Sequence, residues 1–388
     1  VEILDFGTTL AQDIDLGRLD GISSILIGDL AGASNLSGLA ATNNIEFSAA
    51  GTGAATLTLG DATGTADVVN VNLKASAIIT QAITAPNVET VNYVGNDAAA
   101  ANVSAINVST LVATKATTVN VSGNDGLTLT STSATKITTF DASGVVANDS
   151  SDTTANMAVT YTSANTSTTA AVSITGGAGN DTLEGNASVD TINGGAGDDI
   201  ITATAGNDVV AGGAGADTVT FSDTLFDGNS ATTATHTGGA GTDTLDLAAT
   251  ASIVDADFVR ISSFEALTFT SGTNSVTMAA EADATGIASI TGGSGVETID
   301  VSSVDFDNAL TITGGDGADI ITLGDRVDTL GYTLANGADG GALETIASVT
   351  ATTDDVLDNT ADAVTAFTTG TDKINISGAL LTAINGTN

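Results

Sequence analysis

The sequence predicts an all-β protein in which short parallel strands stack as a spiral, or β-solenoid. Three observations carry this prediction: a nine-residue repeat between Gly176 and Thr220, short alternating stretches of apolar and polar residues elsewhere, and few bulky side chains. Hydrophobic residues make up 42% of the chain, but aromatic residues only 3%. Small and β-branched residues therefore supply the apolar mass, which favours thin, repetitive β layers.

Five consecutive nine-residue units place an aspartate at the same position each time. They read GGAGNDTLE, GNASVDTIN, GGAGDDIIT, ATAGNDVVA and GGAGADTVT, and their sixth residues are Asp181, Asp190, Asp199, Asp208 and Asp217. Glycine-rich backbone can turn its carbonyl groups inward while the aspartate supplies negative charge, and such oxygen ligands are those that calcium prefers. The last three residues of each unit predict a short strand with one inward aliphatic side chain.

Apolar burial alone does not account for the stability of these units. One inward side chain per unit buries too little surface to offset the entropy lost when nine residues become ordered. Stacking of the units against one another is therefore required, together with a bound cation or docking onto flanking structure. The regular aspartates favour calcium as that cation.

The units resemble the RTX (repeats-in-toxin) nonapeptides, GGxGxDxUx, of proteins exported by bacterial type I secretion. The resemblance covers residues 176–220 and implies a right-handed parallel β-roll. In such a roll successive turns alternate between two sides, so that a calcium ion lies between units one and three and another between units two and four.

This resemblance implies three complete calcium sites. On one side the predicted ligand sets are Gly177, Gly179 and Asp181 with Gly194, Ala196 and Asp199, and then Gly195, Gly197 and Asp199 with Gly212, Ala214 and Asp217. On the other side they are Asn186, Ser188 and Asp190 with Ala203, Ala205 and Asp208. The second side departs from the family pattern because Asn186, Ser188 and Ala203 stand where glycine is usual. We expect its site to bind calcium more weakly.

Single units of the same kind return later in the chain. GGAGTDTLD starts at Gly238, GGSGVETID at Gly292 and GGDGADIIT at Gly314, which puts Asp243 and Asp319 at the metal position. Isolated units lack a partner two units away, so calcium at Asp243 or Asp319 would need ligands from other segments. Glu297 replaces the aspartate in the second of these units. It also belongs to a set of acidic residues inside apolar triplets, with Glu89, Glu265 and Glu344, and is interpreted first as a structural strand residue.

The flanking regions also read as β structure. Alternating stretches predict strands at 56–59, 68–73, 88–94, 119–122 and 127–130, with turns at Gly95-Asn96-Asp97 and Gly123-Asn124-Asp125. We divide the chain into a Thr/Ala/Val-rich β module (1–172), the calcium β-roll (173–222) and a β module with RTX-like turns (223–388). Whether the flanking modules are solenoids or sandwiches stays open at this point. Residues 363–377, with Phe367 before Gly370-Thr371-Asp372-Lys373, resemble the segment that follows RTX arrays near the export signal.

Charge and residue types exclude several classes of function. The net charge of −39 disfavours nucleic acid and anionic membranes as partners, and the sequence holds neither cysteine nor a stretch long enough for membrane insertion. The only histidine, His236, lies in Thr-Ala-Thr-His-Thr and is expected in a solvated loop. We find no zinc-protease, Gly-x-Ser-x-Gly or phosphate-loop motif, so the sequence predicts no enzyme.

The sequence favours an extracellular structural protein. Its composition resembles that of the surface-layer (S-layer) proteins of Gram-negative bacteria, of the Caulobacter type, which implies type I secretion and calcium-dependent self-assembly into a sheet or filament at the cell surface. The expected partner is a second copy of the chain, with cell-surface polysaccharide as another candidate. Two alternatives stay open: an RTX adhesin or biofilm-matrix protein, and the calcium-binding portion of a secreted hydrolase.

Overall fold

The computed structural model is all-β, with about 4% helix, and its strands pair in parallel. It describes the chain except residues 1, 8, 76–77, 98–105, 149–151, 222–234, 249, 271, 304–309, 316–318, 323–328, 332–344, 351–362, 366–372 and 377–388. The chain divides into two compact units, Val1–Asp217 (unit 1) and Thr218–Asn388 (unit 2). Glu344, Phe367 and Asp372, singled out above, lie outside the described residues.

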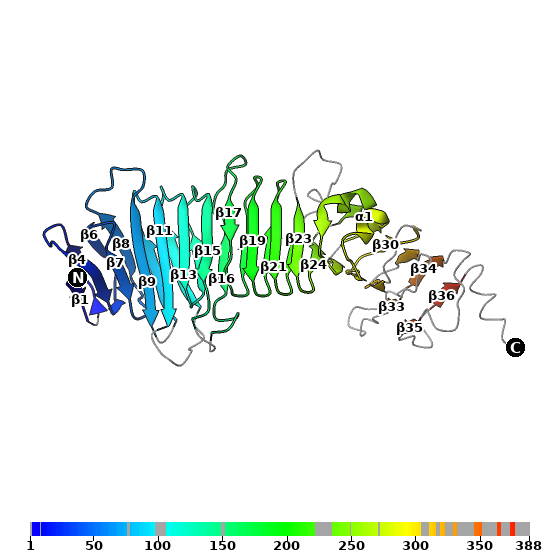
Figure 1. Ribbon diagram of the computed structural model, residues 1–388, viewed down its shortest axis with the longest axis horizontal. Helices are drawn as coiled ribbons and strands as arrows, with labels where there is room; N and C mark the ends of the chain where they lie inside the picture. The colour runs from blue at the N-terminus through cyan, green and yellow to red at the C-terminus, as the bar shows by residue number, and fades with distance from the viewer. Residues whose placement is uncertain are drawn as a thin grey trace. The chain divides into compact units, whose positions relative to one another are not determined.

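Unit 1 contains two main parallel sheets (Figure 1). Sheet 1 consists of β1 (Glu2–Asp5), β4 (Ile22–Ile27), β7 (Asn44–Phe47), β9 (Val68–Ala75), β11 (Thr90–Asp97), β13 (Thr118–Gly123), β15 (Thr139–Val145), β17 (Ser173–Thr175), β19 (Thr191–Ala196) and β21 (Val209–Ala214). Sheet 2 consists of β3 (Ile14–Asp15), β6 (Ser34–Leu39), β8 (Ala54–Leu59), β10 (Thr80–Thr84), β12 (Asn107–Val112), β14 (Leu127–Ser131), β16 (Val159–Thr162), β18 (Thr182–Glu184) and β20 (Ile200–Ala203). The short strands β2 (Thr9–Leu10) and β5 (Asp29–Leu30) pair separately.

Unit 2 continues the parallel arrangement with its own pairings. One group is β22 (Thr218–Phe221), β24 (Thr244–Leu247), β27 (Ala266–Phe269), β29 (Ser289–Thr291), β31 (Thr311–Thr313), β33 (Thr329–Gly331) and β35 (Ala363–Thr365). A second group, sheet 3, is β25 (Ser252–Ile253), β28 (Asn274–Thr277), β30 (Glu297–Asp300), β32 (Ile320–Thr322), β34 (Thr345–Thr350) and β36 (Lys373–Ile376). β23 (His236–Ala240) pairs with β26 (Ile261–Ser262), and the short helices are η2 (Asp255–Arg260) and α1 (Ala280–Asp283).

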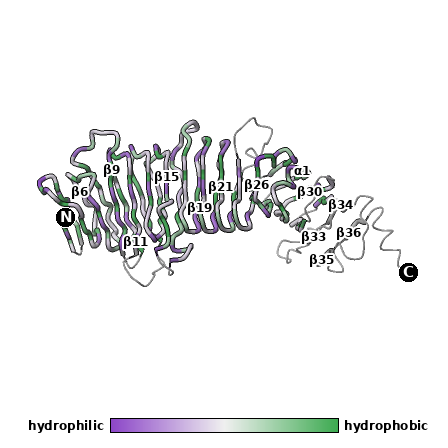
Figure 2. The backbone as a smooth tube through the Cα atoms, in the orientation of Figure 1, coloured by the Kyte–Doolittle hydropathy of each residue, from purple (hydrophilic) through white to green (hydrophobic). Residues whose placement is uncertain are grey.

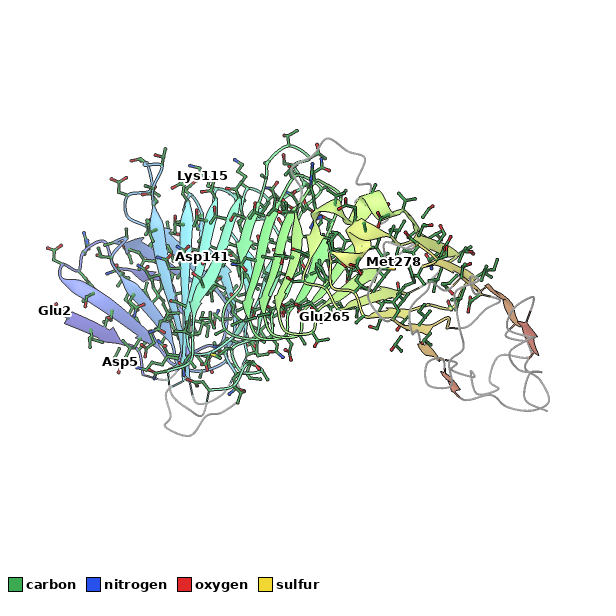
Figure 3. All side chains as sticks on the ribbon, turned by 45° about the vertical axis from the view of Figure 1, so that its right-hand side comes forward. Glu2, Asp5, Lys115, Asp141, Glu265 and Met278 are labelled. Carbon is green, nitrogen blue, oxygen red and sulfur yellow. The ribbon has the colours of Figure 1, made fainter. Side chains whose placement is uncertain are left out.

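Each coil of unit 1 passes once through sheet 1 and once through sheet 2. The strands alternate between buried and outward residues, which shows as alternating hydropathy along the tube in Figure 2. Equivalent residues stack on the outer face of sheet 1, where the Asn120 and Asn92 Nδ2 atoms donate to Oδ1 of Asn92 and Asn70 at 2.8 Å each. Figure 3 shows the side chains standing out from both faces of the ribbon. Parallel pairing throughout both sheets settles the open alternative: unit 1 is a solenoid.

The core of unit 1 lies between the two sheets. The rings of Phe140 on β15 and Tyr161 on β16 stack with their centroids 3.9 Å apart. Two coils earlier, the hydroxyl of Tyr93 on β11 lies 3.0 Å from the hydroxyl of Ser109 on β12, across the same interior. These large side chains therefore bridge the space between sheet 1 and sheet 2.

Most predicted strands of the first module are confirmed, and one turn is wrong. The alternating stretches at 56–59, 68–73, 119–122 and 127–130 fall within β8, β9, β13 and β14. Gly95-Asn96-Asp97, predicted as a turn, instead ends β11, because Asn96 and Asp97 continue the pairing with Lys74 and Ala75 of β9. A neighbouring strand can hold turn-forming residues in an extended conformation.

The prediction for His236 is also wrong. It begins β23, pairs with Ile261 and is only 6% exposed. Its ring packs edge-on against Phe221 with centroids 4.6 Å apart, and burial lowers its pKa to about 4. The side chain is therefore a neutral core residue at neutral pH. Among the described residues, no helix is long and apolar enough to cross a membrane.

Candidate metal centre

The aspartate turns lie along two opposite edges of unit 1. The repeat units that begin at Gly176, Gly194 and Gly212 have their turns at the ends of β17, β19 and β21 in sheet 1, and we call their side the odd edge. Those that begin at Gly185 and Ala203 follow strands of sheet 2 and form the even edge. This arrangement confirms that successive turns alternate between two sides.

Turns on the same edge are direct neighbours, eighteen residues apart. On the odd edge the Gly176 amide donates to the Asn193 carbonyl (2.8 Å) and the Ala196 amide to the Gly177 carbonyl (2.9 Å). Gly195 pairs with Gly213 in the following coil. The structure therefore brings together the predicted partners of units one, three and five.

One carboxylate oxygen of each aspartate bonds to the coil before it. Asp199 Oδ1 accepts from the Asp181 amide at 2.7 Å, and Asp217 Oδ1 accepts from the Asp199 amide at 2.8 Å. On the even edge Asp208 Oδ1 accepts from the Asp190 amide at 2.8 Å. The sequence reasoning missed this role, although the constant spacing of the aspartates could have suggested it.

The second carboxylate oxygen distinguishes the first coil from the later ones. Oδ2 of Asp181 accepts from the Gly177 amide at 2.6 Å, and Oδ2 of Asp190 accepts from the Asn186 amide at 2.5 Å. In contrast, Oδ2 of Asp199 and of Asp208 is buried and has no hydrogen-bond partner. A buried carboxylate oxygen without a partner is costly, and a bound cation would remove that cost.

Glycine at the first position of a unit leaves room for this carboxylate. A Cβ atom on Gly194 would lie 2.2 Å from Asp199 Oδ2, and one on Gly176 would lie 2.3 Å from Asp181 Oδ2. The second and fourth positions need glycine for a different reason, because Gly195 and Gly197 adopt φ of 114° and 113°. L side chains rarely adopt this backbone region.

Burial dominates the electrostatics of the turns. The five aspartates of the array are at most 2% exposed. Desolvation raises the pKa of Asp181 to about 6, of Asp208 to about 7 and of Asp199 to about 8. The negative charges of Asp181 and Asp217 also raise the pKa of Asp199. A divalent cation between the turns would compensate these charges.

The donor set fits a hard cation. Each pair of turns supplies two carboxylates and glycine-rich backbone, all of them oxygen ligands, and oxygen is the donor that calcium prefers over the nitrogen and sulfur ligands of zinc. The described part of the chain contains no group of three or more His, Cys, Asp or Glu side chains that could hold a metal ion without other ligands. Backbone carbonyl groups would therefore supply much of the coordination.

The even edge differs where its sequence departs from the repeat. Asn186 Oδ1 accepts from the Ser188 amide at 2.6 Å, and Asn186 Nδ2 donates to the Ala170 carbonyl at 3.0 Å. The Thr204 hydroxyl donates to the Asn186 carbonyl. Protein hydrogen bonds thus occupy groups that a glycine-rich turn would leave for a cation, which agrees with the expected weaker site.

The later units are not isolated, which corrects the expectation from the sequence. The turn at Gly292 and the turn at Gly314 lie in adjacent coils, where the Gly292 amide donates to the Thr313 carbonyl at 2.7 Å. The Glu297 amide donates to Asp319 Oδ1 at 2.9 Å, as in the array. Coils of 22 residues bring them together, a spacing that no nine-residue register reveals.

Glutamates extend the same bonding pattern. Glu297 begins β30 and is fully buried, and its Oε1 accepts from Asn274 Nδ2 at 3.0 Å. The Asp243 amide donates to Glu265 Oε2 at 2.7 Å, so the next coil supplies the partner of the unit at Gly238. The described acidic residues of the apolar triplets, Glu89, Glu265 and Glu297, therefore accept hydrogen bonds from the coil before them.

Comparison with known proteins agrees with this geometry. The RTX calcium-binding nonapeptide repeat family, in four copies, matches residues 173–201, 193–223 and 311–330. No curated protein matches the chain. Repeats of this family bind calcium ions. The matched segments include the buried Asp181, Asp199, Asp217 and Asp319, and the chain therefore contains RTX calcium-binding nonapeptide repeats.

Proposed function

We propose that the protein is an extracellular scaffold that folds with calcium and assembles with copies of itself into a sheet or filament at the bacterial surface. Proteins with RTX repeats are generally secreted, and type I secretion is the route proposed for this chain. The proposed ions lie between the paired turns of the array, with Asp181, Asp199 and Asp217 on the odd edge and Asp190 and Asp208 on the even edge. Further ions are proposed at Asp243 and Asp319.

One observation carries this proposal. The calcium turns are built into the same two sheets as the coils before them, since β17, β19 and β21 extend sheet 1 and β18 and β20 extend sheet 2. The repeats are thus part of a continuous scaffold in unit 1. A solenoid of this kind offers long polar faces for contacts between identical subunits.

Electron microscopy tests the assembly. Purified full-length chain is imaged with about 5 mM calcium, a concentration suited to weak extracellular sites. Magnesium at the same concentration is the control, because it demands a tighter octahedral shell. Ordered sheets or filaments with calcium alone are the expected result.

Persistent monomers in calcium would contradict self-assembly. If such monomers bound bacterial cells or purified surface polysaccharide, the adhesin or matrix role would replace it. The acidic surface favours assembly through calcium bridges between subunits, because like charges repel without them.

A further inference from the structure

The buried row at the odd edge changes its chemistry along unit 1. In each coil this row holds the residue at the start of the sheet 2 strand or immediately before it, and the row ends at Asp217, directly before β22, as the strand pairing and the hydrogen bonds between coils show. In chain order the row reads Ile79, Asn107, Leu127, Val159, Asp181, Asp199 and Asp217. All of these side chains are at most 3% exposed. The same position is therefore apolar or neutral before the array and negatively charged within it.

Asparagine makes the same hydrogen bond without a buried charge. Asn107 Oδ1 accepts from the Ile79 amide at 3.0 Å, just as Asp199 Oδ1 accepts from the Asp181 amide at 2.7 Å. The earlier coil thus satisfies the amide of its neighbour with a neutral group. Desolvating an amide costs far less than desolvating a carboxylate.

The early coils also bury more apolar surface than the array. β11 buries Val91 and Tyr93, whereas β18 buries only Leu183, and β20 buries Ile201 and the small Ala203. Each fully buried large side chain contributes roughly 1.5–3 kcal/mol. The early coils therefore gain more stability from apolar burial than the array does.

The first aspartate on each edge accepts one amide from the coil before it and one from its own turn. Both oxygens of Asp181 accept backbone amides, from Val159 (2.7 Å) and from Gly177 (2.6 Å). Asp190 likewise accepts from Val172 at 2.7 Å and from Asn186 at 2.5 Å. Among the aspartates of the array, carboxylate oxygens without a partner begin one coil later, at Asp199 and Asp208.

We propose that the coils through β16 fold without calcium and form the template on which the calcium turns order. Their last strand, β16, presents the Val159 amide that Asp181 accepts, and calcium becomes necessary from Asp199 and Asp208 onward. This inference rests on calcium binding by the array. It does not depend on assembly between copies.

Hydrogen exchange of the full-length chain, followed by mass spectrometry, tests the template. After calcium is removed with EGTA, peptides from β9 to β16 are expected to keep their protection within about twofold. Peptides from β20 and β21 are expected to exchange at least about a hundredfold faster. Equal loss of protection in both regions would overturn the proposal, and so would full protection of the array in EGTA.

Asp199→Asn tests the chemistry of the row. Asparagine keeps the shape of the side chain and removes the buried charge at Oδ2, which lies on the same side of Gly194 as the Gly212 carbonyl. In EGTA the variant should slow exchange of β20 by about tenfold or more, while in calcium it should bind the ion more weakly.

Asp198→Asn is the matched control. Asp198 is the exposed neighbour, and its Oδ1 accepts from the Ala216 amide at 2.8 Å, an interaction that asparagine keeps. It should leave exchange in EGTA unchanged. Unchanged or faster exchange in Asp199→Asn would contradict the role of the buried charge. These readings come from monomers, so a failure to see sheets by microscopy would leave them unaffected.

Discussion

At the scale of single residues, the two carboxylate oxygens of Asp199 have different surroundings. Oδ1 of Asp199 receives an amide from the preceding coil, and Oδ2 remains buried without a protein partner. The hydrogen bond to Oδ1 orders the backbone, and the buried Oδ2 explains why a cation is needed. Asp199 is the central member of the odd edge, because its amide also serves Asp217.

Replacing Asp199 should therefore damage calcium binding more than replacing Asp190. Asp199→Ala removes a ligand proposed for both ions of the odd edge, whereas Asp190→Ala affects only the ion of the even edge. Isothermal titration calorimetry of the two variants measures the number of ions bound and their affinity. Equal losses would contradict the assignment of ions to two edges.

Gly194→Ala should weaken calcium binding although it leaves every carboxylate in place. The added Cβ would lie 2.2 Å from Asp199 Oδ2 and 2.4 Å from the Gly212 carbonyl, so the turn must shift. Gly32→Ala is a suitable control, because its Cβ would meet nothing within 4 Å. Terbium luminescence titration should show a loss of affinity of about tenfold or more for the first variant only. Normal affinity in Gly194→Ala would show that the turn has room to adjust.

At the scale of elements, calcium-free turns should be more stable in acid than at neutral pH. Burial raises the folded-state pKa of Asp181, Asp208 and Asp199 to about 6, 7 and 8, above their ordinary value. Their contribution to stability is fully present below pH about 4 and is lost as the pH rises toward 8. His236 has the opposite sign, since its lowered pKa favours folding above pH about 6.5.

Thermal melts in EGTA, followed by circular dichroism, measure this dependence. Between pH 4.5 and pH 8, a range that spans the titration of these carboxylates, the β-sheet transition assigned to the array should move to lower temperature. With saturating calcium the trend should reverse, because protons then compete with the ion. A calcium-free array that gains stability toward pH 8 would disagree with the burial of these carboxylates.

The nine-residue register made the array predictable, because its period fixes which turns share an edge. Elsewhere the coils vary in length: stacked residues are separated by 22 residues between Asn70 and Asn92 and by 28 between Asn92 and Asn120. Without a constant period, the sequence could not distinguish a solenoid from a sandwich. For the same reason the stacking of Glu297 on Asp319 was missed.

Predictions from local residue types were also wrong where pairing with neighbouring strands determines the structure. His236 stands among threonines that suggest a loop, yet pairing with Ile261 and the contact with Phe221 bury it. The sequence predicts Gly194 as a calcium ligand, whereas the structure shows in addition that a side chain at this position would meet the Asp199 carboxylate. Only three-dimensional neighbours reveal such constraints.

At the scale of the whole molecule, repulsion from the net charge of −39 lowers the stability of the calcium-free chain in addition to the effect of the buried carboxylates. Salt screens exposed charges, with a Debye length of about 30 Å at 0.01 M and about 8 Å at 0.15 M. Salt screens the charges of the buried aspartates much less. Surface repulsion and buried charge should therefore respond differently to sodium chloride.

Sodium chloride should stabilise the calcium-free chain only in part. In EGTA, an increase from about 10 to about 150 mM should raise the midpoint of thermal unfolding modestly, through screening of surface repulsion. Calcium at the same ionic strength should raise it much further, because it compensates the buried carboxylates. Differential scanning calorimetry makes the comparison, and equal midpoints would mean that surface charge alone governs stability.

The alternation of edges also sets the step by which this array could change in length. Each aspartate bonds to the coil eighteen residues away, on its own edge. Loss of residues 194–211 would bring the Asp181 amide to Asp217 Oδ1. Every later turn of the array would then stay on its original edge. Loss of a single nine-residue unit would exchange the two edges for all that follows, so insertions and deletions in this array should come in pairs of units.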